Sequence, residues 1–255
     1  MSKAKKYLDL GLAYVGLDKD EKAIKSFKKA LRIDPDDAFA HTSLGFAYGS
    51  LGKYQMAIES YKQVLRIDPD AAKAHCDLGV AYGKSGMYEE AIESFKQAIR
   101  LDPDNALAHY NLGIAYYDSG KYEEAIESYK QAIEIDPDLA DAHYNLGNAY
   151  IRPGTWTASR VAIESYKQAI RINPDSFAAH YNLGLAYGEL GKYQEAIESY
   201  KQALRISPDN AEVHDNLGGA YISLNDRGSA LEQYKILKKL DTELANRLFN
   251  LIYSE

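Results

Sequence analysis

The 255-residue sequence predicts an all-α fold, a solenoid of stacked helix-turn-helix units, on three observations. A short turn with a proline at its centre recurs every 34 residues, with one interval of 37. Between these turns, apolar residues lie three and four positions apart, which is the spacing of amphipathic helices. The composition, 46% hydrophobic and 26% charged, is sufficient for a buried core. Because units of this length cannot bury an apolar face alone, we expect them to stack on one another. The turn prolines are Pro35, Pro69, Pro103, Pro137, Pro174 and Pro208.

Residues 106–139 show how one unit is built. Its large or apolar positions, in two groups, are His109, Leu112, Tyr116, Ala125, Tyr129 and Ala132. Each group predicts one helix, and Gly113 leaves room for the two helices to approach closely. Gly120 marks the turn between them. Pro137 ends the second helix because proline disfavours a helical conformation in the residue before it.

The segment after the last unit predicts a capping helix. One helical face carries Leu244, Ala245, Leu248, Leu251 and Ile252. A solenoid needs its last repeat covered, and this face can cover it. Phe249 and Tyr253 lie off the face and are candidates for a small exposed patch.

These motifs resemble the tetratricopeptide repeat, whose signature is a large residue, Leu-Gly, Tyr, Ala, an aromatic residue, Ala and Pro. The fourth repeat meets it with Leu112, Gly113, Tyr116, Ala125, Tyr129, Ala132 and Pro137. The resemblance implies a single domain over residues 1–255, with seven repeats starting near residues 4, 38, 72, 106, 140, 177 and 211 and a capping helix at about 242–253. It also implies a right-handed superhelix whose first helices line a concave groove.

The resemblance further implies that positions 2, 5, 6, 9, 12 and 13 of each repeat face this groove. Asparagine recurs at position 6 of the later repeats, often after a tyrosine. A carboxamide both donates and accepts hydrogen bonds, so a row of asparagines can pair with the backbone of an extended peptide. The pattern is similar to the asparagine ladder in the repeat arm of O-GlcNAc transferase. The alternative is that Tyr-Asn-Leu-Gly is simply close to the family average. The peptide-binding candidates are Asn111, Asn145, Asn148, Asn182, Asn216, Tyr110, Tyr117, Tyr144 and Tyr181.

The other groove positions predict a neutral to basic, partly apolar protein or peptide partner. Gly49, Gly83 and Gly188 at position 12 leave gaps for apolar side chains, whereas Tyr117 fills the same place in the fourth repeat. Acidic groove residues outnumber basic ones, with Asp9, Asp77, Asp118, Asp141, Glu189, Glu212 and Asp215 against Lys5, Lys73, Lys84 and Arg152.

Composition and motifs exclude several other functions. A net charge of −7 argues against nucleic-acid binding, and no apolar run is long enough to span a membrane, so we expect a cytoplasmic protein. Cys76 is the only cysteine and can form no intramolecular disulfide. No nucleotide, hydrolase or metalloprotease motif occurs, so we expect no enzyme activity, no cofactor and no metal. The six histidines recur once in each of repeats two to seven, too far apart to converge on one ion.

Two irregularities leave other functions open. Three residues are added within 157–161, which the alignment places at the turn before the second helix of the fifth repeat, beside Pro153 and Trp156. Residues 1–34 are basic and the remainder is acidic, so head-to-tail self-association is an alternative. A structural, self-assembling or engineered consensus-like array is therefore a second hypothesis, and the recognition arm of a larger enzyme is a third.

Overall fold

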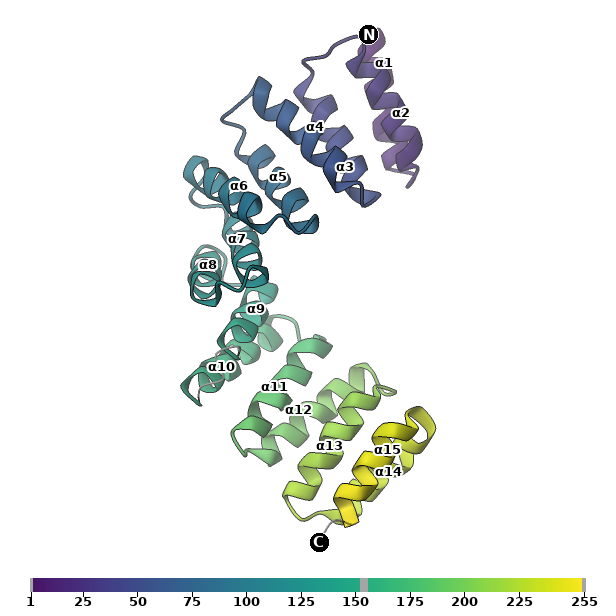
Figure 1. Ribbon diagram of the computed structural model, residues 1–255, viewed down its shortest axis with the longest axis vertical. Helices are drawn as coiled ribbons and strands as arrows, with labels where there is room; N and C mark the ends of the chain where they lie inside the picture. The colour runs from purple at the N-terminus through teal and green to yellow at the C-terminus, as the bar shows by residue number, and fades with distance from the viewer. Residues whose placement is uncertain (1, 152–155, 254–255) are drawn as a thin grey trace. The chain divides into compact units, whose positions relative to one another are not determined.

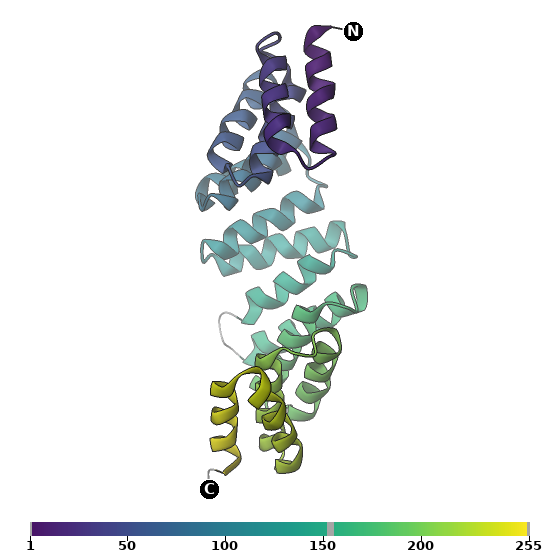
Figure 2. The same ribbon diagram turned by 90° about the vertical axis from the view of Figure 1, so that its right-hand side faces the viewer.

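The computed structural model describes residues 2–151 and 156–253, except the side chains of 156–158, and this part of the chain contains fifteen α-helices and no strand. The contacts divide the chain into two compact units, Met1–Ile135 and Asp136–Glu255, referred to here as the first and second units. Within each unit, helices pair in sequence order and each pair packs on the next (Figure 1, Figure 2). One domain over residues 1–255 stays a prediction.

The first unit holds four helix pairs. Its helices are α1 (Lys3–Val15), α2 (Asp20–Leu31), α3 (Ala38–Ser50), α4 (Tyr54–Ile67), α5 (Ala72–Lys84), α6 (Tyr88–Leu101), α7 (Ala106–Asp118) and α8 (Tyr122–Ile135). The second unit holds three pairs and a final helix. These are α9 (Ala140–Ile151), α10 (Trp156–Ile172), α11 (Phe177–Glu189), α12 (Tyr193–Ile206), α13 (Ala211–Ser223), α14 (Arg227–Leu240) and α15 (Thr242–Tyr253). The predicted stack of seven helix pairs with a capping helix is confirmed.

A glycine opposite an aromatic ring holds each of the first six pairs together. In the fourth pair a Cβ atom on Gly113 would lie 2.6 Å from two ring carbons of Tyr129, closer than any ordinary contact. The Tyr129 side chain is 1% exposed, so its ring fills the space that the glycine leaves. In the seventh pair Leu248 of α15 replaces the aromatic ring, at 2.5 Å from the position of a Cβ on Gly218.

Each histidine bonds to the turn before its helix. The Nε2 atom lies 2.8–3.0 Å from the carbonyl oxygen of the proline six residues earlier. Because a carbonyl oxygen only accepts, Nε2 carries the hydrogen and donates it. This bond ties the start of each first helix to the preceding proline turn, a role that the sequence did not suggest. The residues are His41, His75, His109, His143, His180 and His214.

The capping helix α15 covers the last pair, but one of its predicted contacts is wrong. Ala245, Leu248 and Ile252 are fully buried, as the pattern predicts, whereas Leu251 is 49% exposed. Four apolar positions within nine residues already cover a wide arc, and α13 and α14 contact only part of it. Leu251 therefore faces outward.

The three added residues of the fifth repeat lengthen a helix. Helix α10 has 17 residues, whereas α4, α6, α8, α12 and α14 have 14, and it begins at Trp156, the residue that aligns with the first residue of those helices. The prediction that the insertion enlarges the turn is therefore wrong, since the residues extend the helix by about 4.5 Å at 1.5 Å per residue. Pro153 and the side chain of Trp156 lie outside the described residues.

The length and hydropathy of the helices bear on membrane insertion. Among the helices of the described ranges, none is both long enough and apolar enough to cross a bilayer.

Candidate functional site

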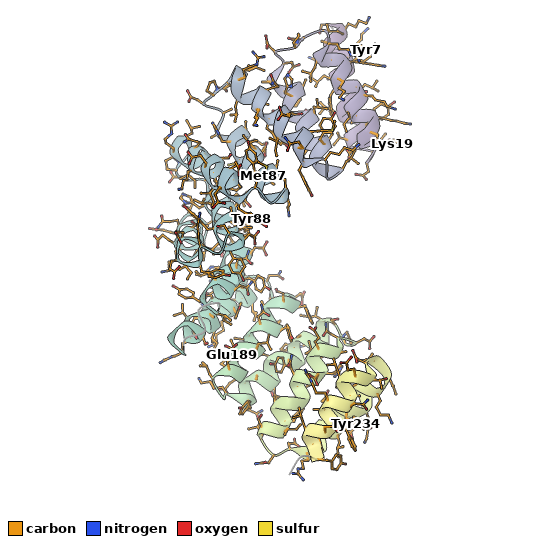
Figure 3. The ribbon with its side chains drawn as sticks, viewed as in Figure 1. Tyr7, Lys19, Met87, Tyr88, Glu189 and Tyr234 are labelled. Carbon is orange, nitrogen blue, oxygen red and sulfur yellow. The ribbon has the colours of Figure 1, made fainter. Side chains whose placement is uncertain are left out.

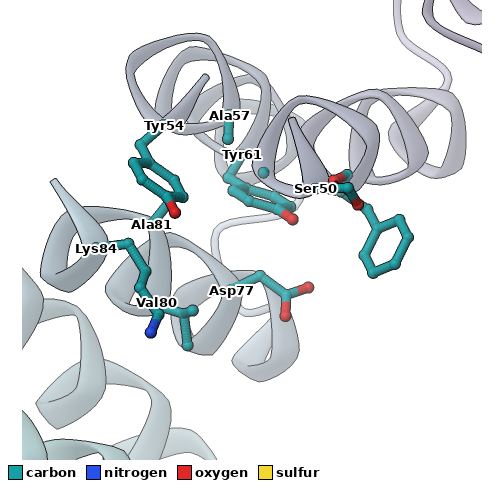
Figure 4. Close-up of a pocket in the computed structure, with 10 residues that line it drawn as sticks. Ser50, Tyr54, Ala57, Tyr61, Asp77, Val80, Ala81 and Lys84 are labelled. Atoms are coloured by element: carbon teal, nitrogen blue, oxygen red, sulfur yellow. Dashed lines mark hydrogen bonds between the residues drawn. The ribbon is translucent and has the colours of Figure 1, made fainter. Parts of the chain in front are cut away.

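A pocket between the second and third repeats is the first part of the candidate site. Figure 4 shows Tyr54 and Tyr61 of α4 on one side, and Asp77 and Lys84 of α5 on the other. Its volume is about 400 Å³. Gly49 at the end of α3 forms one wall, and a Cβ there would have no atom within 4 Å. We refer to this pocket as the Gly49 slot.

A second pocket lies one repeat further along the same unit. The Gly83 slot has a volume of about 130 Å³ and is lined by Tyr88, the first residue of α6 (Figure 3), and by Asn111 and Asp118 of α7. Val80 and Lys84 line both slots, so the two pockets are neighbours along the first helices of the unit.

The second unit contains a pocket of the same construction. The Gly188 slot, of about 570 Å³, is lined by Tyr193 and Tyr200 of α12 and by Asn216 of α13. The cap contributes Arg247 and the exposed Leu251.

The three slots share one geometry, which their sequence positions explain. Each has a glycine at position 12, a tyrosine five residues later and the first helix of the next repeat. The gaps predicted at Gly49, Gly83 and Gly188 are thus confirmed. In the fourth repeat Tyr117 takes the place of the glycine, and its ring meets Tyr122 edge-on at 5.3 Å between centroids. A position-12 side chain therefore decides whether a slot is open.

Two of the candidate asparagines pair with tyrosines of the preceding repeat. Asn182 Nδ2 donates to the Tyr144 hydroxyl over 3.1 Å, and Asn216 Nδ2 donates to the Tyr181 hydroxyl over 3.0 Å. Burial raises the pKa of Tyr181, with Glu212 adding to the effect and the Asn216 bond opposing it. The hydroxyl therefore stays protonated at neutral pH and keeps its own hydrogen to donate. The sequence suggested neither pairing.

Asn148 joins the same network in the second unit. Its Oδ1 accepts from the Tyr166 hydroxyl at 2.8 Å and from Asn182 Nδ2 at 3.0 Å, and its Nδ2 donates to Asn145 Oδ1 at 3.4 Å. Asn182 thus uses both amide hydrogens within the protein and offers a ligand its carbonyl oxygen as an acceptor. The network fixes the orientation of these side chains before any ligand binds.

The candidates of the first unit all lie on α7, and one of them reaches a slot. Asn111 lines it, and the Tyr110 ring packs at 6.0 Å from the buried Tyr129. Tyr117 fills the next position, as described above. The structure therefore brings Asn145, Asn148, Asn182 and Asn216 into the second unit and places Asn111 in the first.

Two carboxylates lie beside the slots of the first unit, each near one lysine charge but without a hydrogen-bond donor among the described residues. Burial raises the pKa of Asp77, against the opposing charge of Lys73, and burial raises the pKa of Asp118, against Lys84. Within the described residues, neither carboxylate accepts a hydrogen bond or forms an ion pair. Burial, with the charge of Asp77, also raises the pKa of Cys76 to about 11, so this thiol is not a reactive nucleophile.

Arg247 is the site residue that the sequence did not reveal. Its guanidinium forms an ion pair with Asp215, whose side chain is 5% exposed. The sequence predicts Asp215 to be one of the acidic positions available to a ligand, and this prediction is wrong because Arg247 of the cap neutralises its charge. A basic residue on one face of a predicted capping helix was the only sequence signal for this contact.

The described residues contain no group of three or more histidine, cysteine, aspartate or glutamate side chains that could hold a metal ion. The histidine Nε2 atoms point to backbone carbonyls instead. The asparagines, tyrosines and slots described above instead form a surface with hydrogen-bonding groups at fixed positions beside apolar hollows.

Comparison with known proteins agrees with this architecture. A family model described as TPR repeat matches residues 11–52, 47–86, 84–120, 115–154 and 161–191, and one described as tetratricopeptide repeat matches residues 177–210. None of the curated proteins compared with the chain matches it.

Solved structures show the same fold. A crystal structure of MamA protein is 33% identical, with a TM-score of 0.61, and the match covers 69% of this chain and 94% of that one. YrrB, titled a TPR protein with an unusual peptide-binding site, is 24% identical, with a TM-score of 0.60 over 73% of this chain and 95% of that one. A tetratricopeptide repeat protein from Parabacteroides merdae is 18% identical, with a TM-score of 0.69 over 98% of this chain and 99% of that one. The chain belongs to the tetratricopeptide repeat family.

Proposed function

We propose that this protein is a non-catalytic scaffold that binds extended protein segments at the slots of each unit. Repeats of this family generally mediate protein interactions. The observation that carries the proposal is the recurrence of the slot wherever glycine occupies position 12, next to asparagines whose orientation is already fixed. Apolar side chains of the segment enter the slots, and asparagine side chains bond to its backbone. A cytoplasmic location stays a prediction.

Each candidate residue has a role in this proposal. Asn182 and Asn216 present carbonyl oxygens to backbone N–H groups, while Asn145 and Asn148 hold the network in place. Tyr144 and Tyr181 give flat contact area. In the first unit, Asn111 acts as an asparagine of the ladder and Tyr110 and Tyr117 give contact area.

The first test fills the slots. Peptides selected by the full chain from a random display library are measured against the Gly49→Tyr/Gly83→Tyr/Gly188→Tyr variant. We expect at least a tenfold loss of affinity, about 1.4 kcal/mol. The variant is expected to fold, because a Cβ at these positions meets no atom closer than 3.9 Å and Tyr117 already occupies the equivalent place. Glu123→Tyr, which adds an exposed tyrosine on α8, is the matched control.

A second arm tests the asparagines. Asn→Ala at 111, 145, 182 and 216 removes the carbonyl acceptors together with the hydrogen bonds that orient them, and we expect a similar loss of affinity. The melting temperature is measured beside it, because the same bonds join neighbouring repeats. Selected peptides that bind the slot-filled variant as tightly as the original chain would show that this surface is not the site.

One observation favours self-association as a second function. Leu10 of α1 is 43% exposed, whereas the equivalent leucine of each other repeat is 3–8% exposed. This exposed leucine lies in the basic segment 1–34, so the acidic remainder of a second copy is its expected partner. The equivalent residues are Leu44, Leu78, Leu112, Leu146, Leu183 and Leu217.

The expected result is a light-scattering mass that rises with protein concentration and falls with added salt. Leu10→Lys is expected to fold, since the side chain lies outside the core. Its mass is expected to stay at that of the monomer, because the added charge disrupts the apolar contact. A monomer mass for the unmodified chain at every concentration and salt would contradict self-association.

A further inference from the structure

The two slots of the first unit are close enough for one short segment to enter both. They share Val80 and Lys84, and packed helices lie about 8–10 Å apart. A polyproline II chain advances about 3.1 Å per residue with three residues per turn, so side chains three residues apart project in the same direction about 9 Å from one another. A segment in this conformation therefore places residues i and i+3 at the two slots.

Both slots suit apolar side chains of moderate size. Aromatic rings and small or apolar residues form most of their walls, and Phe46 and Val80 are 56% and 40% exposed at the slot edges. The Gly49 slot, at about 400 Å³, is larger than the Gly83 slot, at about 130 Å³. Exposed apolar side chains around a hollow are typical of a binding surface rather than of a solvated face.

The charges at the slots favour a cation between the two apolar residues. Asp77 lines the Gly49 slot and Asp118 the Gly83 slot, while Lys84 is the one cation among the residues that line either of them. Asp77 is half-buried and Asp118 is exposed, and burial raises the pKa of both against the opposing charges of Lys73 and Lys84. Neither carboxylate accepts a hydrogen bond within the described residues. A charge that has already lost hydration gains more from a new partner than a fully solvated one does.

We propose that the first unit binds an extended basic segment, with apolar side chains at i and i+3 in the Gly49 and Gly83 slots and a lysine or arginine between them, next to Asp77 and Asp118. This rests on the proposed function and adds the chemistry of the partner. An acidic segment would place its carboxylates against Asp77 and Asp118, so the surface rejects it by repulsion as well as by lost contacts.

The test uses the full chain and fluorescein-labelled peptides in an anisotropy titration. The probe is Gly-Ser-Leu-Lys-Ser-Leu-Ser-Gly, and the comparison peptides replace its lysine with glutamate or place the two leucines two residues apart. We expect the lysine peptide to bind at least tenfold more tightly than the glutamate peptide, and the altered spacing to weaken binding at least fivefold.

Two charge variants identify the carboxylates responsible. Asp77→Asn/Asp118→Asn is expected to bring the lysine and glutamate peptides within twofold of each other. Asp70→Asn/Asp104→Asn removes the same charge from exposed turns of the same unit and is expected to leave the tenfold preference unchanged.

Equal binding of the lysine and glutamate peptides, or a preference that survives in Asp77→Asn/Asp118→Asn, would overturn the inference. So would failure of the lysine peptide to bind while display-selected peptides still bind and are blocked by slot filling, and in that case the proposed function would stand. Loss of all slot-dependent binding, display-selected peptides included, would remove the proposed function itself.

Discussion

Gly113→Ala is expected to lower the free energy of unfolding by about 2 kcal/mol. The added methyl group would lie 2.6 Å from two carbons of the Tyr129 ring, which is 1% exposed and has no space to move into. Overpacking of this kind lowers the free energy of unfolding by about 3 kcal/mol, and the better helix propensity of alanine offsets about 1 kcal/mol of this loss. Denaturant unfolding of the full chain, followed by circular dichroism, measures the change.

Gly49→Ala is the matched control for this prediction. It makes the same substitution in a first helix of the same unit, where a Cβ would meet no atom within 4 Å. Because only helix propensity changes, the variant is expected to be more stable by about 0.5–1 kcal/mol. Equal effects of the two substitutions would show that the contact between Gly113 and Tyr129 does not hold the helix pair together.

Arg247→Ala is also expected to destabilise the protein by about 2 kcal/mol, with the loss concentrated in the cap. The substitution leaves the Asp215 carboxylate, which is 5% exposed, without its cationic partner. A buried charged group without a partner costs more than the net value of the pair it has lost. Hydrogen exchange of α13, α14 and α15 is expected to accelerate, while exchange in the first unit stays unchanged.

The control for the ion pair is a double variant. Asp215→Asn with Arg247→Gln removes both charges and keeps groups that can share a hydrogen bond, so it is expected to recover at least half of the loss. Lys238→Ala removes an exposed cation from α14 and is expected to have an effect within about 0.5 kcal/mol. If Arg247→Ala has no larger effect than Lys238→Ala, the pair does not anchor the cap.

Local sequence signals predicted most of the fold. The proline turns separate the repeats, and the first helices from the second repeat onward begin at the predicted residues, from Ala38 to Ala211. The glycine at position 8 and the aromatic residue of the second helix predicted close packing of each pair. Such signals act within one or two helices, and for that reason they can be recognised from residue spacing alone.

Parts of the site depended on contacts between repeats and were beyond the sequence. The glycines at position 12 predicted open slots, because a missing side chain leaves space whatever its neighbours are. The hydrogen bond between Asn216 and Tyr181, by contrast, joins residues 35 positions apart, and no local sequence pattern shows that they are partners. The prediction for the insertion failed because three extra residues can extend either a loop or a helix, and only the structure shows that α10 is longer.

The amino-acid sequence was sufficient to predict the family and the number of repeats, and it supplied the candidate positions for a ligand. These properties follow from periodicity, which repetition makes visible seven times over. The three-dimensional arrangement decided which of those positions remain available. Asp215 is neutralised by Arg247, and both amide hydrogens of Asn182 are used within the protein. Asp77 and Asp118 accept no hydrogen bond from any residue that the structure describes. Availability depends on which side chains meet across neighbouring helices, and that is set by tertiary packing rather than by the order of residues.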